Sequence, residues 1–93
     1  MVADKAAALL SQAEALLLQV EASQPGLAAY NLACLAALQH RPADAVRWLR
    51  TCQTHGTLES EEYLRANPCF DPIRNTPEFT TWWAESFAAM SRK

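Results

Sequence analysis

Residues 27–52 read LAAYNLACLAALQHRPADAVRWLRTC, a stretch that predicts two consecutive helices. Its first half, up to Gln39, is almost entirely apolar, which predicts a largely buried helix over residues 27–39. Pro42 then suits the first turn of a second helix, because its φ is already helical and the amide it lacks would be unpaired there. We therefore expect a helix over residues 42–55, antiparallel to the first because the connecting turn is so short.

A further helix is expected upstream of this pair. Between residues 3 and 22 apolar residues recur at steps of three and four, which is typical of one buried helical face. The apolar positions on this predicted face are Leu9, Leu10, Ala13, Leu16, Leu17 and Val20. Pro25-Gly26 ends this helix, and Gly56 is placed to end the second helix of the pair in a left-handed cap.

The remaining third of the chain is predicted to be helical too. Thr57 can cap a helix over residues 58–67, and Thr76-Pro77 can open a C-terminal capping helix over residues 77–91. A short turn of helix opens in the same way at Asp71-Pro72. No run of alternating β-branched residues is present, so the prediction is an all-α fold.

Composition narrows the class of protein. At 93 residues the chain fits one domain, residues 1–93, and a hydrophobic fraction of 51% argues against intrinsic disorder. The formal net charge is −2, and the eight Lys and Arg residues are scattered rather than gathered in a stripe that would follow phosphates. We therefore expect no nucleic-acid partner.

The expected compartment follows from the N-terminal region and the cysteines. The first apolar stretch is interrupted by Ser11, Gln12 and Glu14, which suits neither a signal peptide nor a membrane span. The three cysteines are an odd number, and Cys34 and Cys52 fall inside apolar helical patterns where a free thiol acts as a small hydrophobe. These features predict a cytoplasmic protein with no membrane partner.

The central helix pair carries a family motif. Its first helix opens with Tyr30-Asn31-Leu32-Ala33, and small residues recur in its second helix from Ala45 to Cys52. This combination resembles one tetratricopeptide repeat, in which an aromatic-Asn-Leu-small sequence opens the first helix. Small residues at Ala33 and Ala45 would let the two helix axes approach closely.

The tail adds to the resemblance. Its segments 67–74, reading NPCFDPIR, and 76–79, reading TPEF, are similar to the closing segment of many tetratricopeptide arrays. The pair departs from the family pattern at Ala29, at Ala36 and in the turn His40-Arg41-Pro42, so only one repeat is clear. The resemblance implies antiparallel helical hairpins in a right-handed array of about five helices.

The resemblance also implies a binding groove. Tetratricopeptide arrays bind peptides or helices in a groove lined by the first helix of each hairpin. Here that helix would contribute Leu27, Tyr30, Asn31, Cys34 and Leu38. Asn31 would either hold the ligand backbone or hydrogen-bond a neighbouring helix. None of the five is Lys or Arg, so we expect an apolar or helical ligand rather than a terminal carboxylate.

The C-terminal helix has more large apolar side chains than one helix face easily hides. Trp82 and Trp83 are adjacent and so diverge by about 100° on a helix. At most one can face the core fully unless both sides are covered, which makes the pair a candidate aromatic interface. The alternative is that both are core residues, as aromatic residues at helical spacing usually are.

Catalytic and metal sites have little support in the sequence. Cys52 and His55 are three residues apart, but a structural zinc site requires four ligands and a Cys-His nucleophile requires a third, orienting group. Two isolated glycines exclude a Gly-rich phosphate loop. We therefore expect no enzyme activity, no metal and no cofactor.

These features favour a non-catalytic protein-interaction module or scaffold. It would bind a peptide or helix of a partner protein through the groove or through the aromatic C-terminal helix. The alternative is a structural role, in which the chain associates with itself, for example as a homodimer, or caps a larger helical assembly.

Overall fold

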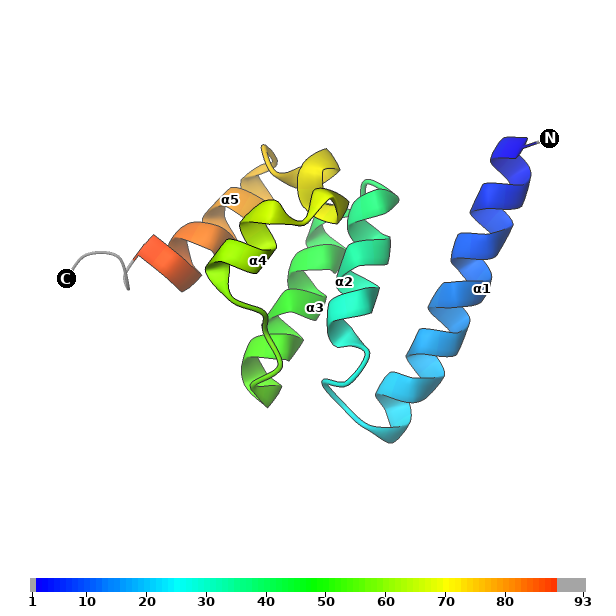
Figure 1. Ribbon diagram of the computed structural model, residues 1–93, viewed down its shortest axis with the longest axis horizontal. Helices are drawn as coiled ribbons and strands as arrows, with labels where there is room; N and C mark the ends of the chain where they lie inside the picture. Colours follow the sequence, from blue (N-terminus) through cyan, green and yellow to red (C-terminus); the bar gives the residue numbers. More distant parts are fainter. Residues whose placement is uncertain (1, 89–93) are drawn as a thin grey trace.

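The structure is a computed structural model that describes the backbone of residues 2–88 and the side chains of residues 8–87. Every element in this range is helical, which confirms the all-α prediction (Figure 1). The elements, in chain order, are α1 Val2–Ser23, α2 Ala29–Leu38, α3 Pro42–His55, α4 Glu61–Ala66, the 3-10 helix η1 Pro68–Ile73, α5 Pro77–Trp83 and the π-helical turn η2 Ala84–Ala88.

Glycine and proline set the ends of the helices much as predicted. α3 begins at Pro42 and ends at Gly56, whose φ of 70° is left-handed. α5 begins at Pro77, where the hydroxyl of Thr76 accepts a hydrogen bond from the amide of Phe79. The predicted C-terminal helix continues beyond α5 as a π-helical turn, and its residues 89–91 lie outside the described part of the chain.

The start of α4 differs from the prediction. Ser60 caps this helix, since its hydroxyl accepts a hydrogen bond from the amide of Tyr63 at 3.2 Å. Thr57, the predicted cap, instead donates from its hydroxyl to the carbonyl of Gly26 at 2.9 Å. The predicted helix over 58–67 is therefore shorter, because residues 57–60 cross the molecule in an irregular conformation.

The short helix near Asp71-Pro72 also starts earlier than predicted. The side chain of Asn67 accepts a hydrogen bond from the amide of Cys69 at 2.9 Å and so caps η1 at its first residue, Pro68. Pro72 consequently lies inside the 3-10 helix rather than opening it. Arg74 follows the helix and donates to the carbonyl of Asn67 at 2.6 Å.

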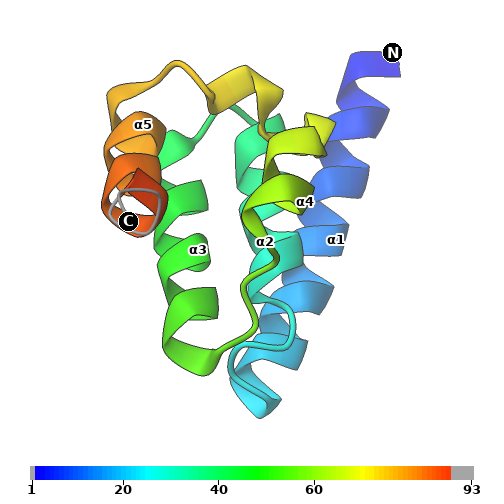
Figure 2. The same ribbon diagram turned by 60° about the vertical axis from the view of Figure 1, so that its left-hand side comes forward.

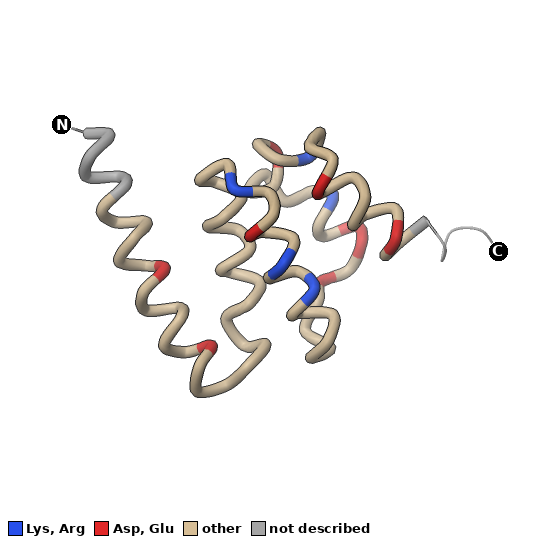
Figure 3. Tube along the Cα trace, turned by 180° about the vertical axis from the view of Figure 1, so that it is seen from behind, with Lys and Arg blue, Asp and Glu red and all other residues tan. Residues whose placement is uncertain are grey.

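The helices pack around the central pair. α2 and α3 lie side by side and run in opposite directions (Figures 1 and 2). η1 packs against α2, and α5 packs against α3. α1 meets α2 at the turn that joins them and diverges from it away from that turn, as Figure 3 also shows. A membrane-crossing helix is not found among residues 2–88.

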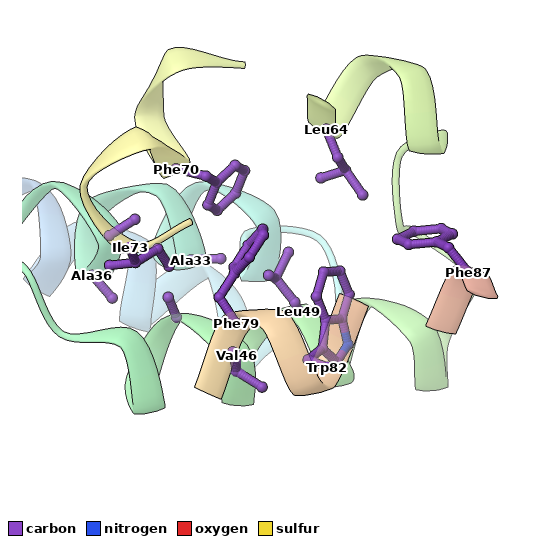
Figure 4. Packing of buried hydrophobic residues seen from close by; sticks show 12 residues of the cluster. Ala33, Ala36, Val46, Leu49, Leu64, Phe70, Ile73, Phe79, Trp82 and Phe87 are labelled. Atoms are coloured by element: carbon purple, nitrogen blue, oxygen red, sulfur yellow. The ribbon is translucent and has the colours of Figure 1, made fainter. Parts of the chain in front are cut away.

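The core lies between α2, α3 and the segments that follow them (Figure 4). α2 and α3 contribute mainly small or aliphatic residues, as the close approach at Ala33 and Ala45 predicts. Later segments contribute the large side chains, among them Phe70 of η1 and Trp82 of α5, both fully buried. Among the described side chains, α1 adds none to this cluster.

The burial of α1 also differs from the prediction. The apolar positions at steps of three and four predict one buried face, yet Leu9, Leu16 and Val20 are exposed. Leu10 and Leu17, on the part of that face that lies toward α2, are half-buried. One neighbouring helix covers only part of a wide apolar stripe, and a sequence alone does not say which part.

Candidate functional site

Large apolar side chains that remain exposed are concentrated in one part of the molecule. Seven are found among the described residues, and one of these, Tyr63, lies on α4. The other six belong to α1, to the turn after it or to α2, and they are Leu9, Leu16, Leu18, Val20, Leu27 and Leu38. Single exposed apolar residues are ordinary, but a concentration of them marks an interaction surface.

α1 presents an exposed apolar stripe, which we call the α1 seam. It consists of Leu9, Ala13, Leu16 and Val20, which follow each other at steps of four, three and four residues. Leu9 is 65% exposed and Leu16 is 63% exposed. This spacing places the four side chains along one side of the helix, as in the seam of a coiled coil. Leu18 is exposed as well but lies off the seam, because it is two residues from Leu16.

α2 presents a second stripe with the same spacing, which we call the α2 seam. It consists of Leu27, in the turn before α2, and Asn31, Cys34 and Leu38, again at steps of four, three and four residues. Leu27, Asn31 and Leu38 are exposed, and Cys34 is half-buried. The side chain of Asn31 forms no hydrogen bond within the described residues. Three of the five predicted groove residues, Asn31, Cys34 and Leu38, thus lie along one side of α2, and Leu27 precedes the helix.

Tyr30, the fifth predicted groove residue, borders the α2 seam rather than lining it. Its hydroxyl accepts a hydrogen bond from Asn67 Nδ2 at 2.7 Å, and its ring packs against the rings of Tyr63 and Phe70. Burial raises the pKa of Tyr30 to about 12, although the hydrogen bond from Asn67 acts in the opposite direction. Asn67 also donates to Cys34 Sγ at 3.8 Å, so α4 and η1 partly cover this edge of α2.

The turn between α1 and α2 fixes the two seams relative to each other. Glu21 is 8% exposed, and its carboxylate accepts hydrogen bonds from the amides of Gly26, at 2.6 Å, and Ala28, at 3.0 Å. The carbonyl of Gly26 accepts the hydrogen bond from Thr57 described above. The turn is therefore tied both to α1 and to the chain after α3.

Neither seam contains a charged residue. Between Ala22 and His40 the chain has no Asp, Glu, Lys or Arg. From Ala8 to Ser23, α1 has two charged residues, Glu14 and Glu21 (Figure 3). Glu21 is engaged in the turn, and Glu14 forms an ion pair of 2.7 Å with Arg41. The α1 and α2 seams therefore suit an apolar partner.

The structure places the two tryptophans of the predicted aromatic interface differently. Trp82 is fully buried, and its indole nitrogen donates to Gln53 Oε1 at 3.1 Å, so it offers no surface to a partner. Trp83 is half-buried and stacks against Phe79 with 5.8 Å between ring centroids. Of the two, only Trp83 is accessible, because α3 covers the side of α5 that carries Trp82.

An open pocket with a volume of about 400 Å³ lies beside Trp83. Arg65 and Arg74 stand at its walls, and the remaining lining residues are Phe79, Thr80, Trp83 and Ala84. Arg65 pairs with Glu61 and lies 5.4 Å from the Trp83 ring, and Arg74 pairs with Asp71 at 2.8 Å. Both arginines that line the pocket are therefore paired with a carboxylate. The sequence did not predict the pocket, because its lining residues come from separate elements.

The candidate nucleophile and metal ligands of the sequence do not come together. Cys52 is fully buried, and burial raises the pKa of its thiol. His55 is exposed and lies over Gly26. Within residues 8–87, no three side chains of His, Cys, Asp or Glu are grouped so that they could hold a metal ion.

Comparison with protein-family models, with curated proteins and with solved structures found no match to the chain. The resemblance to a tetratricopeptide repeat therefore depends on the residues from Tyr30 to Cys52 and on the tail segment from residue 67. Function has to be inferred from the chemistry of the surface itself.

Proposed function

We propose that the chain is a non-catalytic protein-interaction module that binds a helix of a partner protein along the α1 and α2 seams. The observation that carries the proposal is that two neighbouring helices each expose a stripe with the four-three-four spacing of helix packing. The finer architecture, a tetratricopeptide-like array of helical hairpins, is part of the same proposal and is supported by the α2–α3 hairpin.

The spacing of the seams favours a helical ligand. An amphipathic helix inserts apolar side chains at positions three and four residues apart, and such side chains fit between residues with the same spacing. Leu9 and Leu16 of α1 and Leu27 and Leu38 of α2 would supply the apolar contacts. Asn31 would act as the polar position that fixes the register of the ligand, as an isolated Asn does in coiled coils.

A second copy of the chain is the alternative occupant. The α1 seam is uncharged and could pack against the same seam of another copy around a two-fold axis, which is the commonest symmetry of oligomers. This alternative corresponds to a structural, self-associating role. Light scattering distinguishes the two, because a stable monomer is incompatible with obligate self-association.

The test compares two exposed leucines on different sides of α1. A photoreactive amino acid replaces Leu16, in the seam, or Leu18, outside it, and the products cross-linked in source-cell lysate are mapped by mass spectrometry. We expect cross-links from position 16, but not from position 18, to one helix-forming segment of another protein. Leu16→Lys should weaken that complex about tenfold or more, as expected for a residue at the centre of an interface, whereas Leu18→Lys should not.

Two outcomes would contradict the proposal. Cross-links from position 16 to a second copy of the chain would establish self-association instead. A complex that survives Leu16→Lys but is lost with Trp83→Ala would move the binding surface to the pocket beside α5. Lysine is a good helix former, so neither lysine variant should perturb α1 itself.

A further inference from the structure

We propose that Cys34 and Cys69 are a paired oxidation site, which a small-molecule disulfide such as oxidised glutathione converts into an intramolecular disulfide bond. The inference is independent of the proposed function. It concerns the contact between η1 and α2, at the border of the α2 seam.

The two thiols meet where η1 packs against α2. Cys34 lies on α2 and Cys69 on η1, two elements that pack against each other, and the Cys69 thiol is near enough to Cys34 to raise the pKa of its thiol. The side chain of Asn67 touches both residues, because its Nδ2 lies 3.8 Å from Cys34 Sγ and its Oδ1 accepts a hydrogen bond from the Cys69 amide at 2.9 Å. These contacts hold the pair together without a covalent bond.

Exposure separates this pair from the third cysteine. Cys34, Cys52 and Cys69 are all free, but Cys52 is fully buried on α3, whereas Cys34 and Cys69 are half-buried. A dissolved disulfide can therefore reach the edge formed by Cys34 and Cys69 and cannot reach Cys52. Accessibility is a requirement for exchange, along with thiolate character.

The reaction balances with one molecule of oxidised glutathione. The sulfur of Cys69 attacks one sulfur of glutathione disulfide, a mixed disulfide forms, and the first glutathione leaves with the Cys69 proton. The sulfur of Cys34 then attacks the Cys69 sulfur, the bond to glutathione breaks, and the second glutathione leaves with the Cys34 proton. Two cysteine thiols are oxidised to one disulfide, and one glutathione disulfide is reduced to two glutathione thiols.

The surroundings of Cys34 disfavour it as the thiol that attacks first. Burial, together with the neighbouring Cys69 thiol, raises the pKa of Cys34 to about 12, which keeps this thiol protonated at neutral pH. The thiolate is the nucleophile in exchange, so the Cys34 thiol is a poor group to attack a dissolved disulfide. In the second step Cys34 must lose its proton as its sulfur attacks, and its position beside the mixed disulfide on Cys69 offsets the raised pKa. Cys69 is therefore the residue that meets the oxidant.

Tryptic digestion can identify which cysteines are joined by a disulfide. Trypsin cleaves after Lys5, Arg47, Arg50, Arg65 and Arg74 but leaves the Arg41-Pro42 bond intact, so the three cysteines fall in different peptides, residues 6–47, 51–65 and 66–74. The native full-length chain is incubated with oxidised glutathione, its remaining thiols are alkylated, and the digest is analysed by mass spectrometry. We expect peptide 6–47 joined to peptide 66–74, and an alkylated thiol in peptide 51–65.

Matched variants test the order of the two steps. Cys34→Ser should stop the reaction at a stable mixed disulfide on Cys69, and Cys52→Ser should leave the cross-link unchanged. The oxidised wild type should unfold at a higher temperature than the reduced form, because the bond closes a long loop between α2 and η1. A bond to Cys52, a cross-link between two chains, or a mixed disulfide that persists on wild-type Cys69 would each overturn the inference.

Discussion

Gly26 is the residue at which α1, α2 and α3 come together. Its φ of 92° lies in the left-handed region that disfavours every residue with a side chain. A Cβ at this position would lie 2.5 Å from the Cβ of His55, which is closer than two carbon atoms can pack. Gly26 is therefore required both by the backbone and by the close approach of the last turn of α3.

Gly56 provides a matched control for this position. Its φ of 70° is also left-handed, but a Cβ there would meet no atom within 4 Å. We expect Gly26→Ala and Gly56→Ala each to lose about 1–2 kcal/mol of unfolding free energy through backbone strain. Gly26→Ala should lose about 1–3 kcal/mol more through its overlap with His55. Urea unfolding of both variants measures the difference, and equal losses would contradict the role given to His55.

The sequence predicts interactions between residues that are neighbours in the chain, but it does not predict contacts between residues far apart in it. The left-handed cap at Gly56 and the proline starts of α3 and α5 were predictable because each depends on residues next in the chain. Thr57 was assigned as a cap on the same local grounds, yet its hydroxyl bonds the carbonyl of Gly26, thirty-one residues away. A contact over that separation exists only once the helices have packed.

Two glutamates of α1 hold this helix to the rest of the molecule. The carboxylate of Glu21 accepts two amide hydrogen bonds in the turn, and Glu14 pairs with Arg41 further along the helix. The first arrangement is buried and charge-assisted, whereas Arg41 has 41% of its side chain exposed. Glu21 should therefore contribute more than Glu14 to holding α1 in place.

Replacing each glutamate by glutamine tests this difference. Glu21→Gln keeps the shape of the side chain but leaves one of the two amides without an acceptor, at a cost of about 1–3 kcal/mol. Glu14→Gln removes a partly exposed ion pair that contributes only about 0–1 kcal/mol. Hydrogen exchange should show faster exchange in α1 and its turn for Glu21→Gln, with α2 and α3 less affected. Unchanged exchange in α1 would show that Glu21 does not anchor it.

The sequence predicts the two seams unequally. The α2 seam was within reach, because the family resemblance named Leu27, Asn31, Cys34 and Leu38 as groove residues. The α1 seam was not, because its residues share an apolar stripe with Leu10 and Leu17, and only the packing of α2 decides which part of that stripe is covered. Periodicity shows that a helix has an apolar face but does not show the neighbour that covers it.

Trp82 is the largest fully buried side chain among the described residues. Trp82 contacts the rings of Phe79, Trp83 and Phe87 and is fully buried, whereas Trp83 remains half-buried beside the pocket. The sequence predicted that adjacent tryptophans diverge on a helix but not which of them would face α3. That choice follows from the turn between η1 and α5, which sets the rotation of the last helix.

Truncation of the two tryptophans should affect stability unequally. Trp82→Ala leaves a cavity in the core and should lower the unfolding free energy by about 3–5 kcal/mol. Trp83→Ala removes a partly exposed ring and should cost less than half as much. Urea denaturation followed by circular dichroism gives both values, and a larger loss for Trp83→Ala would contradict the placement of these rings.

The absence of charge from Ala22 to His40 has a consequence for how a partner would be held. A ligand that docks on these residues meets no charged side chain of α2, so association would proceed with little long-range attraction, at rates of about 10⁵–10⁶ M⁻¹ s⁻¹. Added salt should have little effect on contacts to the α2 seam, and the partly exposed Glu14–Arg41 pair beside the α1 seam is the ionic contact that it would weaken. Binding should show a negative heat-capacity change, because apolar surface becomes buried in the complex.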